Sequence, residues 1–120
     1  MMPSHFGKWV LAAYTLALTA VSLTPAEALQ EVNANDKVAH FACYCLFALL
    51  LGTVPLRTRQ YLIGGVLLAL YGLALEGLQS LVPGRDCSLL DALANAAGVA
   101  SGLTLLFIYF HVRQARTKSV

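Results

Sequence analysis

The feature that most constrains this chain is a series of four long apolar segments separated by short polar stretches. The segments cover residues 9–23, 38–54, 61–82 and 88–110. A helix that crosses a membrane needs about 20 apolar residues, with a range of roughly 17 to 25. The third and fourth segments meet this requirement, the second is at its lower limit, and the first is short unless it extends to residue 27. With only 12% charged residues and a mean hydropathy of +0.70, the composition predicts a membrane protein rather than a small soluble domain.

Prolines mark the ends of the first three segments. Pro25, Pro55 and Pro83 each follow a segment, where proline ends a helix without removing an interior hydrogen bond. Because the connecting stretches are short, successive helices are expected to be antiparallel neighbours. The prediction is therefore an all-α fold: an integral membrane four-helix bundle that forms a single domain over residues 1–120. Its spans are expected at about 9–27, 38–54, 61–82 and 88–110, followed by a polar tail at 111–120.

The distribution of lysine and arginine predicts the orientation of the helices. Six of the eight lie in three regions that share one side of a four-span protein: Lys8, Arg57, Arg59, Arg113, Arg116 and Lys118. The other side has only Lys37 and Arg85. Because cytoplasmic loops are enriched in lysine and arginine, both termini and the tail are expected in the cytoplasm.

The first segment also allows a second interpretation. A charged start, an apolar stretch and the Ala-Glu-Ala sequence at 26–28 are typical of a signal peptide cleaved after Ala28. Cleavage there would leave three spans. Against this, Thr15, Thr19 and Ser22 recur at helical spacing on one face, as in a helix that stays in a bundle. We favour retention of the first helix.

The scarce polar residues fall on single faces of the predicted helices. At 100° per residue, Glu76 and Gln79 share a face of the third helix with small residues, and Asp91 and Asn95 share a face of the fourth. Small residues let helices approach closely where lipid supplies no hydrophobic drive, so we expect these faces to point into the bundle. The glycines expected at helix contacts are Gly72, Gly98 and Gly102. The residues expected to meet lipid on the opposite face of the fourth helix are Leu89, Leu93, Ala100 and Phe107.

The polar residues also come to one level along the helices. Glu76 lies about 22 Å along the third helix from Tyr61, at about 1.5 Å per residue. This is the outer third of a hydrocarbon core about 30 Å thick, and the second and fourth helices begin at the same level. We therefore predict a polar pocket near the outer face, in which opposite charges nearly balance. Its residues are Asp36, Lys37, His40, Tyr44, Glu76, Gln79, Arg85, Asp91 and Asn95.

Two of the acidic residues have both a functional and a packing interpretation. An ionisable side chain inside a membrane is a functional candidate by default. This favours Glu76 as a binding or acid–base group over a carboxylate that only pairs with Arg85 or Asn95. Asp91 is expected in the first turn of a helix, where Ser88 can cap and the helix dipole favours a carboxylate. Packing therefore explains Asp91 as well as function does.

The basic residues also have both a functional and a packing interpretation. His40 is either a histidine at a helix contact or, paired with a nearby carboxylate, a general base. A metal site on His40 and Cys43 would need ligands that this spacing does not supply, so we predict neither a metal nor a cofactor. Lys37 and Arg85 either anchor the chain at the interface or hold an anionic headgroup or phosphate.

Four short stretches resemble one known family. They are DKVAHFACY (36–44), EGLQ (76–79), PGRDCSLLD (83–91) and DALANAAG (91–98). In this order and spacing the chain, from about residue 22 to 102, resembles the VanZ-like family of small bacterial membrane proteins, named for a teicoplanin-resistance protein. The resemblance implies a multi-pass protein of the bacterial cytoplasmic membrane with a retained first helix. It also implies that the pocket residues, together with Phe41 and Gly98, belong to the family's pattern.

Three classes of function fit such a pocket. The first is a non-catalytic envelope protein that binds a lipid-linked or lipophilic molecule, which in the family context implies resistance to a glycopeptide antibiotic. The second is a membrane enzyme that acts on a lipid phosphate or ester through Glu76, His40 and Arg85. The third is a small carrier or channel subunit.

The distribution of polar groups separates these classes. They concentrate at one level, which disfavours a conduction path, and no nucleophile motif or metal set stands out, which disfavours an enzyme. The formal charge of +2, without a basic run, disfavours nucleic acid as a partner. We therefore expect the first class, with membrane lipids or a lipid-linked ligand as the partner.

Overall fold

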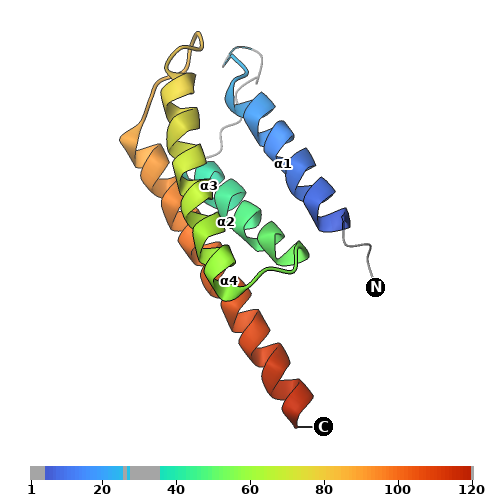
Figure 1. The fold of residues 1–120 in the computed structure, drawn as a ribbon. Helices are drawn as coiled ribbons and strands as arrows, with labels where there is room; N and C mark the ends of the chain where they lie inside the picture. The colour runs from blue at the N-terminus through green and yellow to red at the C-terminus, as the bar shows by residue number, and fades with distance from the viewer. Residues whose placement is uncertain (1–4, 26, 28–35, 120) are drawn as a thin grey trace.

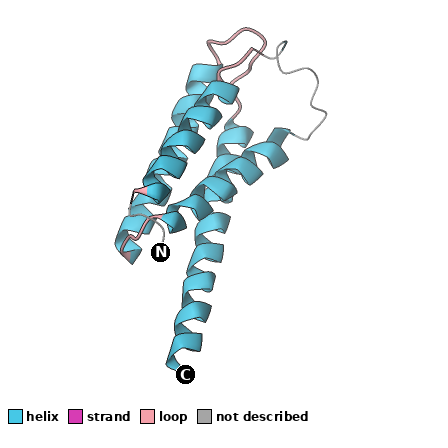
Figure 2. Cartoon of the chain, turned by 90° about the vertical axis from the view of Figure 1, so that its right-hand side faces the viewer, coloured by secondary structure: helices cyan, strands magenta, loops and turns pink. Residues whose placement is uncertain are grey.

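The protein is α-helical throughout the part that the structure describes. The structure is a computed structural model that describes residues 5–25, 27 and 36–119. Its helices are α1 (Phe6–Ser22), α2 (Asp36–Leu50), α3 (Thr58–Gln79) and α4 (Leu89–Lys118), and these residues contain no strand. The all-α prediction is confirmed. Successive helices run in opposite directions (Figures 1 and 2).

Three of the described helices are long and apolar enough to cross a membrane, by length and composition. They are α3, α4, and α2 together with the 3-10 turn η2 (Leu51–Thr53) that continues it. Helix α1 is apolar but has 17 residues and ends at Ser22, short of the expected limit at residue 27. Its end precedes Pro25, and a residue before proline disfavours helical geometry. Ala26 and Ala28 of the signal-peptide motif, and residue 29 after the expected cleavage point, lie outside the described residues.

Helix α4 is longer than its apolar segment. It continues past residue 110 to Lys118, so most of the expected tail is an exposed helix. The sequence after Gly102 contains no proline or glycine to end the helix. Arg116 and Lys118 in the last turn also complement the negative end of the helix dipole. Figure 1 shows this end of α4 extending beyond the other helices.

Helices α2 and α4 share the most extensive contact, and two glycines make it possible. A Cβ at Gly98 would collide with the backbone carbonyl oxygen of Phe41, and one at Gly102 with that of Cys45. The two helices therefore approach until backbone meets backbone, which small residues allow. Both glycines were expected at helix contacts, and both lie where α2 and α4 pack.

The burial pattern follows the predicted helix faces with one exception. The exposed large residues on α3 include Leu67, Leu70 and Leu78, whereas Glu76 and Gln79 are buried. On α4, Leu89 and Leu93 are exposed as expected. The core residues are Tyr44, Phe47, Ala48, Leu51, Tyr61, Leu68, Val99 and Leu106.

The exception is Phe107, which was expected to meet lipid but is half-buried. Its ring packs edge-on against Tyr61 of α3, with ring centroids 6.2 Å apart. Tyr61 is held in place because its hydroxyl donates to the carbonyl oxygen of Val54 over 2.8 Å. The prediction for Phe107 was wrong because Tyr61, at the start of α3, packs against its ring. Periodicity along α4 does not reveal a contact from another helix.

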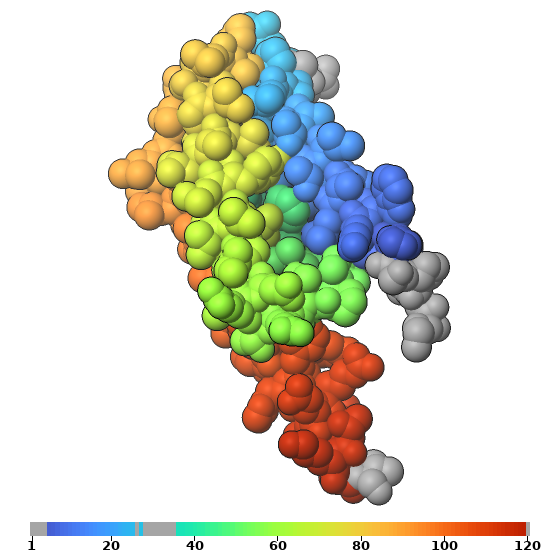
Figure 3. All heavy atoms as spheres, in the orientation of Figure 1, coloured from blue at the N-terminus to red at the C-terminus, as the bar shows by residue number. Residues whose placement is uncertain are grey.

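Helix α1 is attached to the others by hydroxyl groups. The hydroxyl of Tyr14 donates to the carbonyl oxygen of Cys43 in α2 over 2.6 Å. On its threonine face, Thr19 shares a hydrogen bond with the hydroxyl of Tyr71 in α3. Figure 3 shows α1, in blue, lying against α3, in yellow and green. This face, predicted to pack within the protein, is the one that contacts α3.

Candidate functional site

His40 lies where α2, α3 and α4 meet. Its Nδ1 is 2.8 Å from Oδ1 of Asn95 in α4 and 3.4 Å from Oε1 of Glu76 in α3. An amide oxygen only accepts hydrogen bonds, so Nδ1 donates and carries the proton. One imidazole ring therefore connects three helices, and its other nitrogen, Nε2, is left to face away from Asn95.

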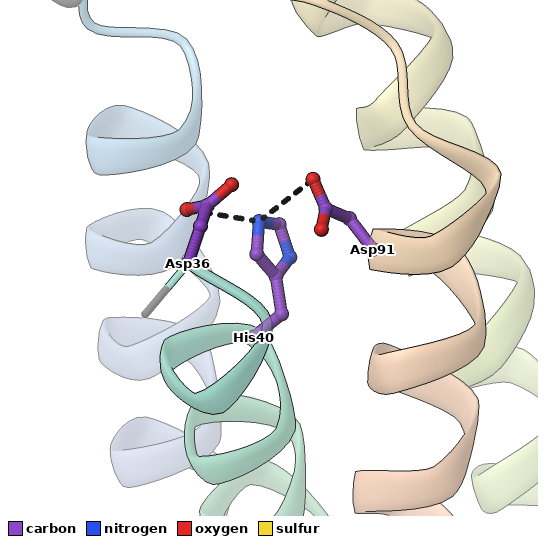
Figure 4. Close-up of side chains that lie close together, drawn as sticks. All are labelled: Asp36, His40 and Asp91. Atoms are coloured by element: carbon purple, nitrogen blue, oxygen red, sulfur yellow. Dashed lines mark ion pairs between the residues drawn. The ribbon is translucent and has the colours of Figure 1, made fainter. Parts of the chain in front are cut away.

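Two carboxylates flank the other side of the ring. Nε2 of His40 is 3.7 Å from Oδ1 of Asp36 and 3.9 Å from Oδ2 of Asp91. Asp36 and Asp91 lie in the first turns of α2 and α4. Figure 4 shows the ring between the two carboxylates, which point toward it from separate helices. The first turns of two helices thus meet at one histidine.

Glu76 is almost completely buried, with 2% of its surface exposed. Its Oε2 accepts a hydrogen bond from the backbone N–H of Ser88 over 3.4 Å, while Oε1 faces His40. The packing interpretation expected Arg85 or Asn95 as its partner, but the contacts are with His40 and Ser88. Glu76 thereby ties the end of α3 to the start of α4.

Asp91 takes the predicted position at the start of α4. Ser88 caps this helix, since its Oγ accepts from the backbone N–H of Asp91 over 3.3 Å. The side chain of Asp91 is buried, and its Oδ1 is 3.8 Å from Nζ of Lys37. That oxygen makes no hydrogen bond. The capping role explains the backbone of Asp91 but leaves one buried carboxylate oxygen without a hydrogen-bond donor.

Arg85 and Gln79 are turned toward α1 rather than toward the carboxylates. Arg85 donates from Nε to the carbonyl oxygen of Thr24 over 3.1 Å and from Nη2 to that of Val21 over 3.2 Å. Gln79 donates from Nε2 to the carbonyl oxygen of Ser22 over 2.9 Å. These carbonyl groups lie at the end of α1 or just beyond it, where few backbone donors remain for the last carbonyl groups of a helix. Both side chains therefore satisfy the end of α1.

The position of Arg85 changes the expected charge balance. Asp36, Glu76 and Asp91 gather around His40, and Lys37 is paired with Asp91. Arg85 was expected to offset one of these carboxylates, but its guanidinium donates to two backbone carbonyl groups. The near balance predicted from the sequence is therefore shifted toward negative charge.

Tyr44 and Gly72 complete the predicted site. Tyr44 is buried, and a Cβ at Gly72 would lie 2.9 Å from its ring and 3.0 Å from the amide nitrogen of Asn95. Gly72 thus makes room for both side chains, as its predicted packing role requires.

A cavity of about 330 Å³ lies beside this cluster, between α1, α2 and α3. Most of the predicted pocket residues line it: Asp36, His40, Tyr44, Glu76, Gln79, Arg85 and Asn95. Lys37 and Asp91 do not. The rest of the wall is mainly apolar and includes Leu18, Val21 and Leu75. The sequence interpretation missed the residues from α1, because nothing in an apolar helix reveals which neighbour it packs against.

The residues around His40 also include a set able to bind a cation. Asp36, His40 and Asp91 offer ligand atoms that all lie within 4.8 Å of one another. The sequence interpretation considered His40 with Cys43 and predicted no metal. The Asp-x-x-x-His spacing at 36–40 was a signal for two ligands on one helix face, but the third ligand comes from another helix.

No protein-family model, curated protein or solved structure matches this chain.

Proposed function

We propose that this chain is a VanZ-like integral membrane protein that binds a lipid-linked or lipophilic molecule in a pocket facing the outside of the cell. In this proposal all four helices lie in the bacterial cytoplasmic membrane, with both termini in the cytoplasm. The protein has no catalytic role, and its binding of an envelope lipid or of the antibiotic itself alters sensitivity to glycopeptide antibiotics.

The observation that carries this proposal is the composition of the cavity wall. The lining combines polar side chains, among them His40, Glu76 and Asn95, with apolar ones, among them Leu18 and Val21 of α1. Such a wall suits an amphipathic molecule whose head meets the polar side chains and whose chain follows Leu18 and Val21. A volume of about 330 Å³ is at the lower end of the usual range for ligand pockets, which is about 300–1,000 Å³. The cavity therefore suits a headgroup or part of a chain, and the rest of the ligand would remain in the bilayer.

The length of α1 is compatible with a fourth span. Its 17 residues extend about 26 Å at about 1.5 Å per residue, slightly less than a core of about 30 Å. A short span is accommodated by local thinning of the bilayer at modest cost. The hydrogen bonds from Tyr14, Gln79 and Arg85 favour a position of α1 alongside the other helices.

The orientation can be tested with the native cysteine of the α3–α4 loop. Cys87 is exposed, whereas Cys43 and Cys45 are partly buried within α2. A membrane-impermeant maleimide should label Cys87 in intact cells. In a Cys87→Ser background, Ser119→Cys at the end of α4 should be labelled only after the cells are opened. Labelling of residue 119 in intact cells would contradict the proposed orientation.

Ligand binding can be tested by native mass spectrometry of the full chain released from nanodiscs. The nanodiscs would contain phosphatidylglycerol with a small fraction of a polyprenyl phosphate. Leu18 lines the cavity and Leu16 is exposed, so Leu18→Trp should remove the retained lipid and Leu16→Trp should not. Equal retention in both variants would show that the lipid binds elsewhere on the protein.

The enzyme alternative is less well supported by the geometry. It requires Arg85 to hold a phosphate, but the Arg85 guanidinium bonds to the carbonyl groups at the end of α1. Incubation of the purified protein with a bacterial lipid extract should leave the extract unchanged by mass spectrometry. A product above the level given by a Glu76→Gln variant would favour the enzyme over the binding protein.

A further inference from the structure

The contacts of Nε2 of His40 with the two carboxylates are longer than hydrogen bonds. Hydrogen bonds have donor–acceptor distances of about 2.7–3.2 Å, but Asp36 and Asp91 stay 3.7 and 3.9 Å from this nitrogen. Two ligands of a tetrahedral Zn²⁺ ion, with bonds of about 2.0–2.2 Å, lie about 3.4 Å apart. The two contacts of Nε2 are therefore too long for hydrogen bonds and near the separation of two ligands of one ion, and the ligand atoms of all three groups in Figure 4 lie within 4.8 Å of one another.

The hydrogen bond on the other side of the ring prepares Nε2 for this role. Because Nδ1 donates to Asn95, Nε2 is the ring nitrogen that can offer a lone pair to a metal ion, and it faces two carboxylates. Histidine ligands of metals nearly always donate their other N–H to an oxygen acceptor, which fixes the tautomer and the ring orientation. Asn95 and Glu76 supply such acceptors here.

A second, independent observation comes from Asp91. The residue is only 6% exposed, and its Oδ1 makes no hydrogen bond. Lys37 is 3.8 Å from this oxygen and its side chain is half-exposed, so it offsets the charge without donating at hydrogen-bond distance. A buried carboxylate that is short of hydrogen-bond donors is costly. A cation coordinated by Oδ2, the oxygen that faces Nε2 of His40, would offset the charge of this carboxylate.

Formal charge also favours a cation. Three carboxylates, from Asp36, Glu76 and Asp91, surround His40, and Lys37 offsets one of them. A divalent ion would bring the remaining formal charge of the group to zero. The Asp36 side chain is largely exposed, so an ion can reach the site from the surface.

We infer that Asp36, His40 and Asp91 form a binding site for a divalent transition-metal cation, with Zn²⁺ as the best match. An imidazole nitrogen favours Zn²⁺ over Mg²⁺ and Ca²⁺, which prefer oxygen ligands. Three protein ligands leave a fourth position open, as in zinc sites that bind a further molecule. The inference is independent of the lipid ligand proposed above, since it depends only on contacts within the chain.

The site can be tested with Zn²⁺ alone on the full chain, without an affinity tag, in detergent. Isothermal titration calorimetry should show one Zn²⁺ per chain, retained in excess Mg²⁺. His40→Gln and Asp91→Asn should each weaken binding at least tenfold. Asn95→Ala, which removes only the acceptor for Nδ1, should weaken it by about 10- to 100-fold. His111 and Cys87 are exposed and are not among the three proposed ligands, so His111→Ala and Cys87→Ser should bind as the unaltered chain does.

X-ray absorption spectroscopy of the unaltered, zinc-loaded chain gives a result that does not depend on the folding of any variant. One imidazole and two or three oxygen ligands are expected. Sulfur in the coordination sphere, or no imidazole, would overturn the inference. So would the absence of saturable binding, or binding that His40→Gln and Asp91→Asn leave unchanged.

Discussion

Nδ1 of His40 in α2 donates a hydrogen bond to Oδ1 of Asn95 in α4 over 2.8 Å. Asn95 is 1% exposed, and in lipid no water is available to replace a lost partner. The bond has two consequences. It sets α2 and α4 against each other near their first turns, and it determines that Nε2 of His40, not Nδ1, faces Asp36 and Asp91.

The coupling between His40 and Asn95 is the first prediction. Asn95→Leu keeps the branched outline of the side chain and removes the acceptor, so it should lower the free energy of unfolding by about 1–2 kcal/mol. In a double-mutant cycle with His40→Leu, measured by unfolding in mixed detergent micelles, the two changes should couple by about 0.6 kcal/mol or more. Strictly additive effects would show that the bond contributes nothing to stability.

The contact between α2 and α4 predicts opposite effects at two glycines. Gly98→Ala places a methyl group against the carbonyl of Phe41 and should lower the free energy of unfolding by about 1–3 kcal/mol. Gly77→Ala, in α3, meets nothing within 4 Å and should be neutral or stabilise by up to about 1 kcal/mol, because alanine favours a helix. The measurement is the detergent unfolding midpoint of each variant. Equal midpoints would contradict the close approach at Gly98.

Arg85 is predicted to hold the end of α1. Arg85→Ala removes two hydrogen bonds from a charged donor to Val21 and Thr24, at a cost of about 1–2 kcal/mol. Hydrogen–deuterium exchange of α1 amides should rise while α2 and α4 stay protected. Arg85→Lys should recover only part of the protection, since one ammonium group does not reproduce the guanidinium fork.

The control for this prediction is Arg113→Ala on the exposed end of α4, which should leave exchange unchanged. If the α1 amides stay equally protected in Arg85→Ala, the hydrogen bonds of Tyr14 and Tyr71, rather than Arg85, hold α1 in place.

Glu76 is predicted to orient the polar end of the cavity. Glu76→Gln keeps the shape of the side chain but replaces one carboxylate oxygen with an NH₂ group. That group would face another donor, either the N–H of Ser88 or the N–H of His40. The variant should insert into the membrane normally and retain at least tenfold less lipid by native mass spectrometry. Asp86→Asn, an exposed change in the neighbouring loop, is the matched control. Full lipid retention in Glu76→Gln would assign Glu76 to helix packing alone.

The accuracy of the sequence interpretation varied with the kind of feature. Burial of Glu76 and Asn95 and the glycine contacts followed from helical periodicity, which acts within one helix. The hydrogen-bond partners of Arg85 did not follow from periodicity, because the carbonyl groups that it bonds to belong to a segment distant in sequence. Phe107 was misplaced for a similar reason, since the ring that covers it comes from α3.

The sequence by itself determined that the chain is helical, which residues face inward, and which end of the helices collects polar groups. Those properties depend on apolar length and on the 3.6-residue period of each helix. Only the tertiary structure decided that Asp36, His40 and Asp91 lie close together. It also decided that Glu76 accepts a hydrogen bond from Ser88 and that Arg85 bonds to the end of α1 rather than to a carboxylate. The physical reason is that these contacts depend on the rotation and axial position of one helix relative to another. Interhelical packing sets both.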